Sequence, residues 1–231
     1  AAAGTVTMNA GAAGTVTGKV TFLAAPNAII DITLVHPTTR EAVPGLTTQN
    51  TGAGNTYSLV GVPYGMYIVW GSYRNDGYVM DPDAIAKSGL PQASVSAAAP
   101  AQEVNLDVTD AIEIHAPTNV PDSLVPERVS TTTPTFSWDS YPQAKEYIVV
   151  VYTHDGERVW GGYDSSGVIL HPQIAQQDTS VVFNFDSSAT QALQPGQVYR
   201  WGVYADDDAV ANVQTLLSAS EDLMGLFVVG Q

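Results

Sequence analysis

The 231-residue sequence predicts an all-β protein made of two tandem β-sandwich domains with a short N-terminal strand-like arm. Short segments of alternating apolar and polar residues recur between turns rich in Asn, Gly and Pro, which is typical of sandwich strands. Helical periodicity is confined to one short segment, and the pattern changes at Ala116-Pro117. We therefore expect an arm over residues 1–13, a first domain over 14–114 and a second over 115–231.

The arm contains a short repeat. Gly4-Thr5-Val6-Thr7 recurs ten residues later as Gly14-Thr15-Val16-Thr17. Both copies alternate as strands do, and Thr and Val favour a pleated surface. One copy begins the first domain, so the other is a spare strand. This arm is either a frayed terminus or a segment that docks on another surface.

The first domain should contain five strands and a single helical turn. The turn is expected near Pro82–Lys87, and the Ala- and Ser-rich segment Gln92–Gln102 is interpreted as an irregular loop. The expected strands are Val16–Leu23, Ile29–His36, Thr56–Val60, Met66–Tyr73 and Glu103–Val108.

Two motifs of this domain carry a family resemblance. Gly18-Lys19-Val20 opens a strand, and Asn55-Thr56-Tyr57-Ser58-Leu59-Val60-Gly61-Val62-Pro63-Tyr64-Gly65-Met66-Tyr67-Ile68-Val69 follows. Together they resemble the carboxypeptidase regulatory-like, or transthyretin-like, domain family. The second motif reads as a hairpin: Tyr57 and Leu59 share one strand face, Gly61–Gly65 form the turn, and Tyr67 and Val69 return on the partner strand. The long segment Asp81–Pro100 departs from the family pattern and is a candidate interaction loop.

Prolines mark the joint between the two domains. Pro117, Pro121 and Pro126 follow one another closely, and proline restricts the backbone. We expect an extended connection with little free rotation.

The second domain resembles a fibronectin type III-like domain. The resemblance implies that Trp138 lies in the core and that Tyr199 forms the tyrosine corner, with its hydroxyl bonded to nearby backbone. Two insertions, Gly161–Asp178 and Asp206–Asp222, exceed the family pattern. The motifs that carry the resemblance are Pro134–Trp138, Ala144–Tyr152, Leu193–Ala205 and the final strand Leu226–Val229.

Charge and composition exclude several kinds of partner. Asp and Glu number 23 against 8 Lys and Arg, a formal net charge of −15, so nucleic acid and anionic membranes are disfavoured. The absence of cysteine excludes disulfides and thiolate metal sites. No apolar run is long enough for membrane insertion. The start without Met indicates either a mature secreted form or a trimmed chain.

The sequence carries no recognised catalytic motif. The histidines His36, His115, His154 and His171 are scattered and fit turns or surface positions. Glu146 and Glu157 could form an acid–base pair, but they are better interpreted as solvated charges beside one hairpin. We therefore expect no enzyme.

Calcium is the one cofactor that the sequence suggests. Asp206, Asp207 and Asp208 follow a strand, and Asn75-Asp76-Gly77 with Asp81 and Asp83 form a second acidic group. Calcium takes six to eight oxygen ligands, which clustered loop carboxylates can supply. Neither group has the spacing of an EF-hand, so solvated turn residues are the alternative.

Aromatic residues give a candidate binding site. Trp160 and Tyr163 lie beside Gly161 and Gly162, and flat aromatic rings can stack on sugars or fill a partner's pocket. The alternative is that Trp160 ends a buried strand. The other tryptophans, which lie in the middle of expected strands, are interpreted as core residues: Trp70, Trp138 and Trp201.

These observations predict a non-catalytic structural or adhesive protein of a prokaryotic cell surface, with itself or other surface proteins as partners. In this hypothesis Gly4, Thr5, Val6 and Thr7 complete an open sheet edge of a neighbouring subunit in a filament or surface layer. A glycan-binding ancillary module is the alternative, with Trp160 and Tyr163 as its contact. We expect the functional surfaces in the arm, in Asp81–Pro100 and in the two insertions.

Overall fold

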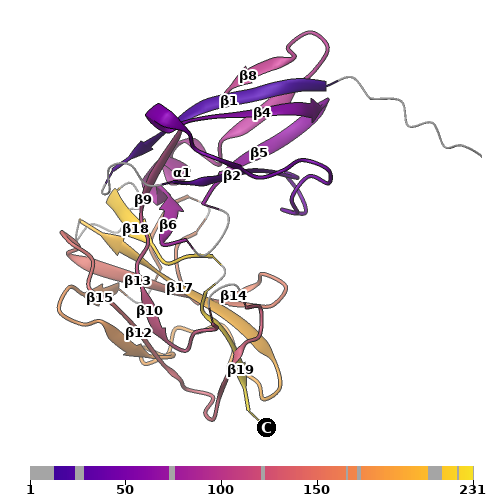
Figure 1. Cartoon of the computed structure of the whole chain (residues 1–231). Helices are drawn as coiled ribbons and strands as arrows, with labels where there is room; N and C mark the ends of the chain where they lie inside the picture. The colour runs from indigo at the N-terminus through magenta and orange to yellow at the C-terminus, as the bar shows by residue number, and fades with distance from the viewer. Residues whose placement is uncertain are drawn as a thin grey trace, which may run out of the picture.

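The computed structural model describes residues 13–23, 29–72, 76–120, 123–164, 166–170, 173–207, 215–222 and 224–230. Within these residues the protein is nearly all β, with a single α-helix, and forms two β-sandwiches stacked end to end, as the sequence predicts (Figure 1). No helix among them is long and apolar enough to cross a membrane.

The first sheet of the first sandwich has β1 near its centre. Its strand order is β4-β1-β9-β6, and β8 also pairs with β1. The N-terminal half of β1 lies antiparallel to β4 and parallel to β8, and its C-terminal half lies parallel to β9. The bounds are β1 Ala13–Phe22, β4 Thr56–Pro63, β6 Tyr78–Met80, β8 Ala101–Glu103 and β9 Leu106–Asp110.

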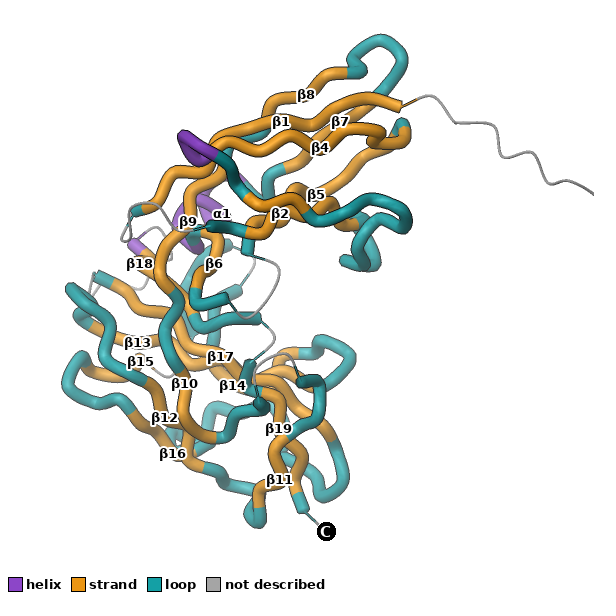
Figure 2. The backbone as a smooth tube through the Cα atoms, viewed as in Figure 1, coloured by secondary structure: helices purple, strands orange, loops and turns teal. Residues whose placement is uncertain are grey.

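The second sheet faces the first across an aliphatic core (Figure 2). Its order is β3-β2-β5-β7, and all its pairs are antiparallel. Alternating residues of both sheets, such as Val16, Val20, Ile32 and Leu34, fill the space between them. The bounds are β2 Asp31–Val35, β3 Gln49–Asn50, β5 Gly65–Gly71 and β7 Gln92–Val95, with a short 3₁₀ turn at Ala53–Asn55.

The prediction that β4 and β5 pair as a hairpin is wrong. Tyr57 and Leu59 do share one buried face, and Tyr67 and Val69 are also buried, but β4 pairs with β1 while β5 pairs with β2 and β7. The turn around Tyr64 therefore carries the chain from one sheet to the other. Alternation specifies which face of a strand is buried and leaves open which strand lies beside it, so both arrangements fit the same pattern.

The segment Gln92–Gln102 is not an irregular loop, because it contains β7 and the first residues of β8. Ala93 and Val95 alternate into the core despite the low apolar content of the segment. The expected helical turn is confirmed as α1, Pro82–Ser88. The Asp81 side chain caps it by accepting the Asp83 N–H at 3.1 Å.

The second sandwich consists of one three-stranded and one larger sheet. The orders are β10-β12-β16 and β11-β19-β17-β13-β14, with β15 beside β13 and β18 beside β17. The expected final strand is confirmed residue for residue as β19. The bounds are β10 Ile114–Ala116, β11 Glu127–Val129, β12 Thr135–Trp138, β13 Glu146–Thr153, β14 Arg158–Gly161, β15 Gln173–Ala175, β16 Ser180–Val182, β17 Val198–Asp206, β18 Leu216–Ala219 and β19 Leu226–Val229.

Aromatic rings fill the core of the second sandwich. The Phe136 ring lies 4.7 Å from that of Trp201, and Trp138 is packed edge-on against Tyr147 at 5.4 Å. The tyrosine corner is present: the Gln194 N–H donates to the Tyr199 hydroxyl at 2.8 Å. The core positions of Trp138 and Trp201 are confirmed, whereas Trp70 is only half-buried.

Hydrogen bonds join the two sandwiches beyond the linker itself. The Ile112 N–H donates to the Ala219 carbonyl at 2.9 Å, which ties the segment after β9 to β18. The hydroxyl oxygens of Thr109 and Tyr141 lie 2.7 Å apart. Ala86 of α1 packs against a small cluster of the second sandwich that includes Leu216. These contacts resist relative movement of the two sandwiches.

Candidate functional site

The described residues do not assemble a calcium site. Asp206 is fully buried at the end of β17, where its carboxylate accepts a hydrogen bond from the Thr215 hydroxyl. Asp207 is half-buried, and Asp208 lies outside the described residues. No group of three acidic or histidine side chains in the described part of the chain is placed to hold a metal ion. Calcium binding by this triad stays a prediction.

The second acidic group has partners within the protein. Asp81 caps α1, and Asp83 forms an ion pair with Lys87, one helical turn further along. Asp76 accepts a hydrogen bond from the Ser72 hydroxyl at 2.5 Å. Each of these carboxylates thus has a local structural role, while Asn75 lies outside the described residues.

The two glutamates considered as an acid–base pair differ in their exposure to solvent. Glu146 is largely buried in β13 and accepts a hydrogen bond from the Gln173 amide at 3.0 Å, so it is not the solvated charge that was expected. Glu157 is exposed in the turn before β14. His154 is exposed in the same turn, and the His115 imidazole lies 2.7 Å from the Asp139 carboxylate at the surface.

Trp160 belongs to the core, and its role as an exposed contact is wrong. It is 1% exposed, its ring lies 5.3 Å from that of Phe183, and its indole N–H donates to Asp186 at 2.9 Å. A ring enclosed in this way cannot stack on a sugar. Of the two interpretations of Trp160, the structure favours the end of a buried strand.

Tyr163 lies on the opposite side of the same sheet. Gly161 and Gly162, both with positive φ, turn the chain after β14, and a Cβ on Gly162 would lie 2.8 Å from a methyl group of Val150. The half-buried Tyr163 ring then packs edge-on against Tyr204 at 5.5 Å. Tyr163 therefore reaches a cavity between the sandwiches, whereas Trp160 does not.

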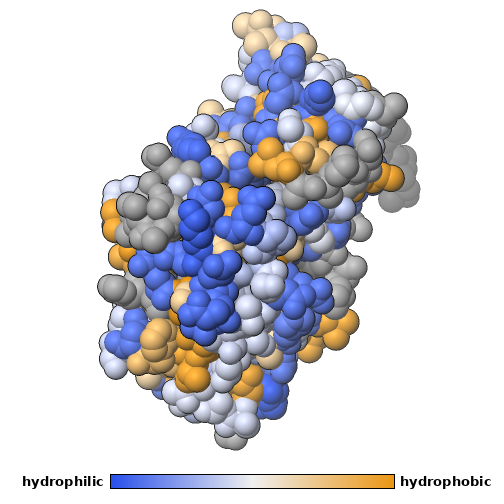
Figure 3. All heavy atoms as spheres, turned by 90° about the vertical axis from the view of Figure 1, so that its left-hand side faces the viewer, coloured by the Kyte–Doolittle hydropathy of each residue, from blue (hydrophilic) through white to orange (hydrophobic). Residues whose placement is uncertain are grey.

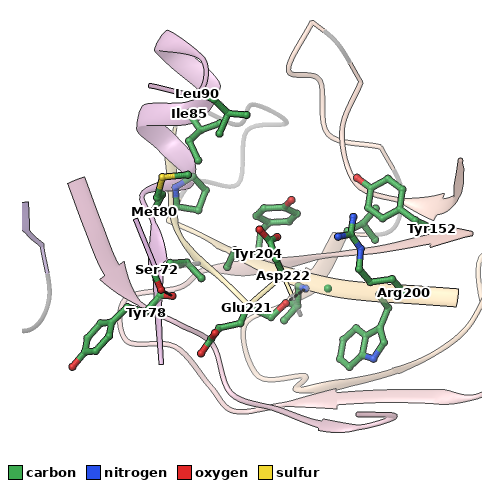
Figure 4. Close-up of a pocket in the computed structure, with 18 of the residues that line it drawn as sticks. Ser72, Tyr78, Met80, Ile85, Leu90, Tyr152, Arg200, Tyr204, Glu221 and Asp222 are labelled. Atoms are coloured by element: carbon green, nitrogen blue, oxygen red, sulfur yellow. Dashed lines mark hydrogen bonds between the residues drawn. The ribbon is translucent and has the colours of Figure 1, made fainter. Parts of the chain in front are cut away.

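This cavity, of about 240 Å³, is lined by residues of both sandwiches (Figure 4). The β17 residues Arg200, Gly202 and Tyr204 point away from the core, because Tyr199, Trp201 and Val203 alternate with them and are buried. Gly202 has no side chain, and the Ser220 hydroxyl lies 3.0 Å from the position that its Cβ would take, so Gly202 and Ser220 together form the base of the hollow between Arg200 and Tyr204. The first sandwich supplies Trp70, Ser72, Tyr78, Val79, Met80, Pro82, Ile85 and Leu90.

Three segments that depart from the two family patterns meet at this cavity. Pro82, Ile85 and Leu90 come from Asp81–Pro100, and Tyr163 comes from the first insertion of the second domain. The second insertion contributes the run from Ala219 to Asp222. Segments that differ from the common sandwich pattern are thus concentrated at one place.

Acidic groups lie at the rim of the cavity on the side of the joint. The carboxylate of Glu221 accepts the N–H of Gly77 in the first sandwich at 2.5 Å. Burial is the main cause that raises the pKa of Glu221 to about 7; the charges of Asp76 and Asp222 act in the same direction, and the Gly77 hydrogen bond acts against it. Across the hollow, the guanidinium of Arg200 lies 5.4 Å from the centre of the Tyr152 ring.

A second candidate surface is the outer edge of β4. Among the described residues β4 is a terminal strand of its sheet, with β1 beside it on the inner side. Its eight residues make it longer than any other terminal strand in the described part of the chain, and it carries no charged residue. Charges, short length, prolines and bulges are the usual protections of a sheet edge against pairing; in β4 the bulge at Gly61 and the proline at Pro63 come at its end and leave Thr56–Val60 without either.

Exposed apolar side chains accompany this edge. Val60 is 70% exposed on β4, Tyr64 follows in the crossing to β5 with 41% exposed, and Met66, near the start of β5, is 55% exposed. Figure 3 shows the molecule turned by 90° from Figure 1; on that face hydrophilic residues cover the middle, and apolar residues form separate patches. An uncharged edge next to exposed apolar side chains suits pairing with another chain.

Gly4, Thr5, Val6 and Thr7 lie outside the described residues. Their second copy is described: Gly14, Thr15, Val16 and Thr17 form the start of β1. There Val16 is buried opposite Leu59 of β4, and Thr15 lies opposite Val60. The repeated sequence is therefore one that β4 already accepts on its inner side.

Sequence reasoning missed the residues of β13 and β17 that line the cavity. Tyr152, Arg200 and Tyr204 alternate with core residues, so their outward direction was readable from the sequence. The position of α1 beside them was not readable, because α1 belongs to the first sandwich and lies far from these strands in sequence.

No family model and no curated protein matches the sequence. A solved structure of BcpA, the major pilin subunit of Bacillus cereus, shares 13% identity over 94% of this chain and 68% of the pilin, with a TM-score of 0.34. A DUF3823 family protein from Bacteroides uniformis ATCC 8492 shares 10% identity over 94% of this chain and 100% of that one, at 0.33. The FN1–FN3 domains of chicken CNTN1 share 9% over 96% and 66%, at 0.32. These similarities are low, and the fold assignment rests on the strands themselves.

Proposed function

We propose that the protein is a non-catalytic structural or adhesive component of a prokaryotic cell surface, and that it self-associates by strand addition. In this proposal residues 4–7 of one copy add to the outer edge of β4 in the next. The observation that carries the proposal is the edge itself: eight uncharged residues form a terminal strand beside exposed apolar side chains.

The repeat in the sequence supports the choice of donor. Because Gly14–Thr17 pairs with β4 on its inner side, an identical segment offers the same Thr-Val-Thr alternation to the outer side. Val6 would then face the sandwich core beside Leu59, as Val16 does on the inner side. The extended hydrogen-bonded contact between the two sandwiches suits a subunit that must keep its shape in an assembly.

Deletion of residues 1–12 tests the donor. We expect the shortened protein to keep its melting temperature, because β1 begins at Ala13, and to remain monomeric by light scattering and electron microscopy. The wild-type protein should assemble at the same concentration. A wild-type protein that stays monomeric at high concentration, or a shortened protein that assembles equally well, would contradict the proposal.

The acceptor edge is tested separately with V60K. A lysine on an edge strand disfavours pairing without burying a charge, because Val60 is 70% exposed. The matched control is V182K on β16, another terminal strand whose Val182 is 44% exposed. We expect V60K to prevent assembly and V182K to leave it intact. Equal effects of the two variants would argue against β4 as the acceptor.

A further inference from the structure

The cavity between the sandwiches lies over the outer face of β17, around Gly202. Gly202 lies opposite Val150 of β13, and the Ser220 hydroxyl lies 3.0 Å from the position that a Cβ of Gly202 would take, so the floor combines backbone, one aliphatic side chain and one hydroxyl. Arg200 and Tyr204 rise on either side of this floor, and α1 covers it from the first sandwich (Figure 4). The result is a concave site with walls from both sandwiches, a common location for small-molecule binding.

Polar groups of opposite character face each other across the hollow. Figure 4 places Arg200 and Tyr152 on one side and Tyr204 and Asp222 on the other. No ion pair joins Arg200 to an acid among the described residues. A guanidinium donates hydrogen bonds only, and a carboxylate accepts them only. A ligand with hydroxyl groups satisfies both, because each hydroxyl can donate and accept.

The remaining walls are aromatic and aliphatic. Tyr152, Tyr163 and Tyr204 of the second sandwich and the half-buried Trp70 of the first line the cavity. Aromatic rings with a polar edge suit a ligand that presents C–H groups on one face and polar groups around its rim. A sugar ring has this distribution.

Charge and size restrict the ligand further. Arg200 disfavours a simple cation, while Glu221 and Asp222 disfavour an anion, so a neutral ligand fits both walls. The volume of about 240 Å³ is below the range of roughly 300–1,000 Å³ typical of drug-sized sites. The space suits one sugar ring and excludes a longer oligosaccharide from full enclosure.

We propose that the cavity between the two sandwiches binds one neutral monosaccharide unit, either free or at the end of a glycan, with Arg200 and Asp222 holding its hydroxyl groups. The site is distinct from the assembly edge at β4 and does not depend on self-association. It also replaces the exposed contact expected at Trp160, while retaining Tyr163 in the wall.

The test uses the full chain and the methyl glycosides of glucose, galactose, mannose and N-acetylglucosamine. Saturation-transfer difference NMR and isothermal titration measure binding to the wild-type protein. We expect at least one glycoside to bind, and R200A and Y204A each to weaken it by tenfold or more, as loss of a charged hydrogen bond or ring contact does. Y64A, at an exposed tyrosine outside the cavity, is the control and should bind as the wild type does.

R200Q and Y204F keep most of the packing and guard against misfolding of the alanine variants. Circular dichroism and the melting temperature show whether each variant is folded. The proposal is overturned if no glycoside binds, or if binding survives R200A and Y204A in folded protein. Binding of glycine betaine or a free amino acid in place of the glycosides would also overturn it, because it would assign the cavity to a zwitterion whose two charges pair with Arg200 and the acidic groups. The deletion of residues 1–12 should leave sugar binding unchanged, which separates this test from that of the assembly.

Discussion

The carboxylate of Glu221 in the second sandwich accepts a hydrogen bond from the backbone N–H of Gly77 in the first, with oxygen and nitrogen 2.5 Å apart. The two residues are far apart in sequence, and their contact lies at the joint beside the cavity. Burial, together with Asp76 and Asp222, raises the pKa of Glu221 to about 7 from an ordinary value of 4.5. The joint is therefore expected to respond to pH near neutrality.

The first prediction concerns this pH dependence. Because the pKa of Glu221 is higher in the folded protein, protonation favours folding: the contribution is complete below about pH 4.5 and is lost as the pH rises through about 7. Between pH 5.5 and pH 8 we expect the wild-type protein to lose on the order of 1 kcal/mol more stability than E221Q, because partial exposure of the carboxylate to solvent reduces the effect of the pKa shift. Thermal unfolding at the two pH values measures this. Identical pH slopes for both proteins would assign the dependence to other groups, such as Asp76.

The second prediction concerns the turn before β19. Gly225 has φ of 76°, and a Cβ there would lie 2.4 Å from the Trp201 carbonyl oxygen. We expect G225A to cost about 3 kcal/mol, because both strain and a backbone clash act. Gly156 is the control: its φ is 92°, but a Cβ there would meet open space, so G156A should cost about 1 kcal/mol. Urea unfolding gives both values, and equal costs would show that the clash is relieved by backbone movement.

The third prediction concerns Trp160. W160L should destabilise the protein by about 3 kcal/mol, because it removes buried aromatic surface and the hydrogen bond to Asp186. F185L, at a ring that is 57% exposed, should cost less than about 1 kcal/mol. Denaturant midpoints measure both. If W160L left stability unchanged, the indole would have to be accessible, and its assignment to the core would fail.

Much of the fold could be predicted from the sequence because alternation and turn residues are local signals. β2 and β13 lie within two residues of the expected segments, β19 matches its expected strand, and α1 is one residue longer than the predicted turn. Local signals do not predict which strands lie beside one another in a sheet. Consecutive strands such as β4 and β5 have the alternation of a hairpin, yet they lie in different sheets, because the residues that separate them are equally able to cross the sandwich.

The candidate sites were predicted less well, for a related reason. Trp160 and Tyr163 are three residues apart, and the sequence did not show that two glycines between them send the rings to opposite sides of a sheet. The cavity combines Arg200 with Trp70 and Ile85, and these come from segments that meet only when the sandwiches are packed together. The expectation that function lies in the departures from the family patterns named segments that line this cavity, but it did not show that they meet.

The position of β1 has a consequence for the order of folding. It is the first described strand of the chain, yet it needs β8 and β9 as parallel neighbours, and the Lys19 N–H donates to the side-chain oxygen of Asn105, 86 residues further along. Until β8 and β9 are available β1 can pair only with β4, and closing the longer loop to them is slow relative to forming local hairpins. The first sheet can be completed only after Asp110 has left the ribosome, so nearly half of the chain must be made before its first strand has all of its neighbours.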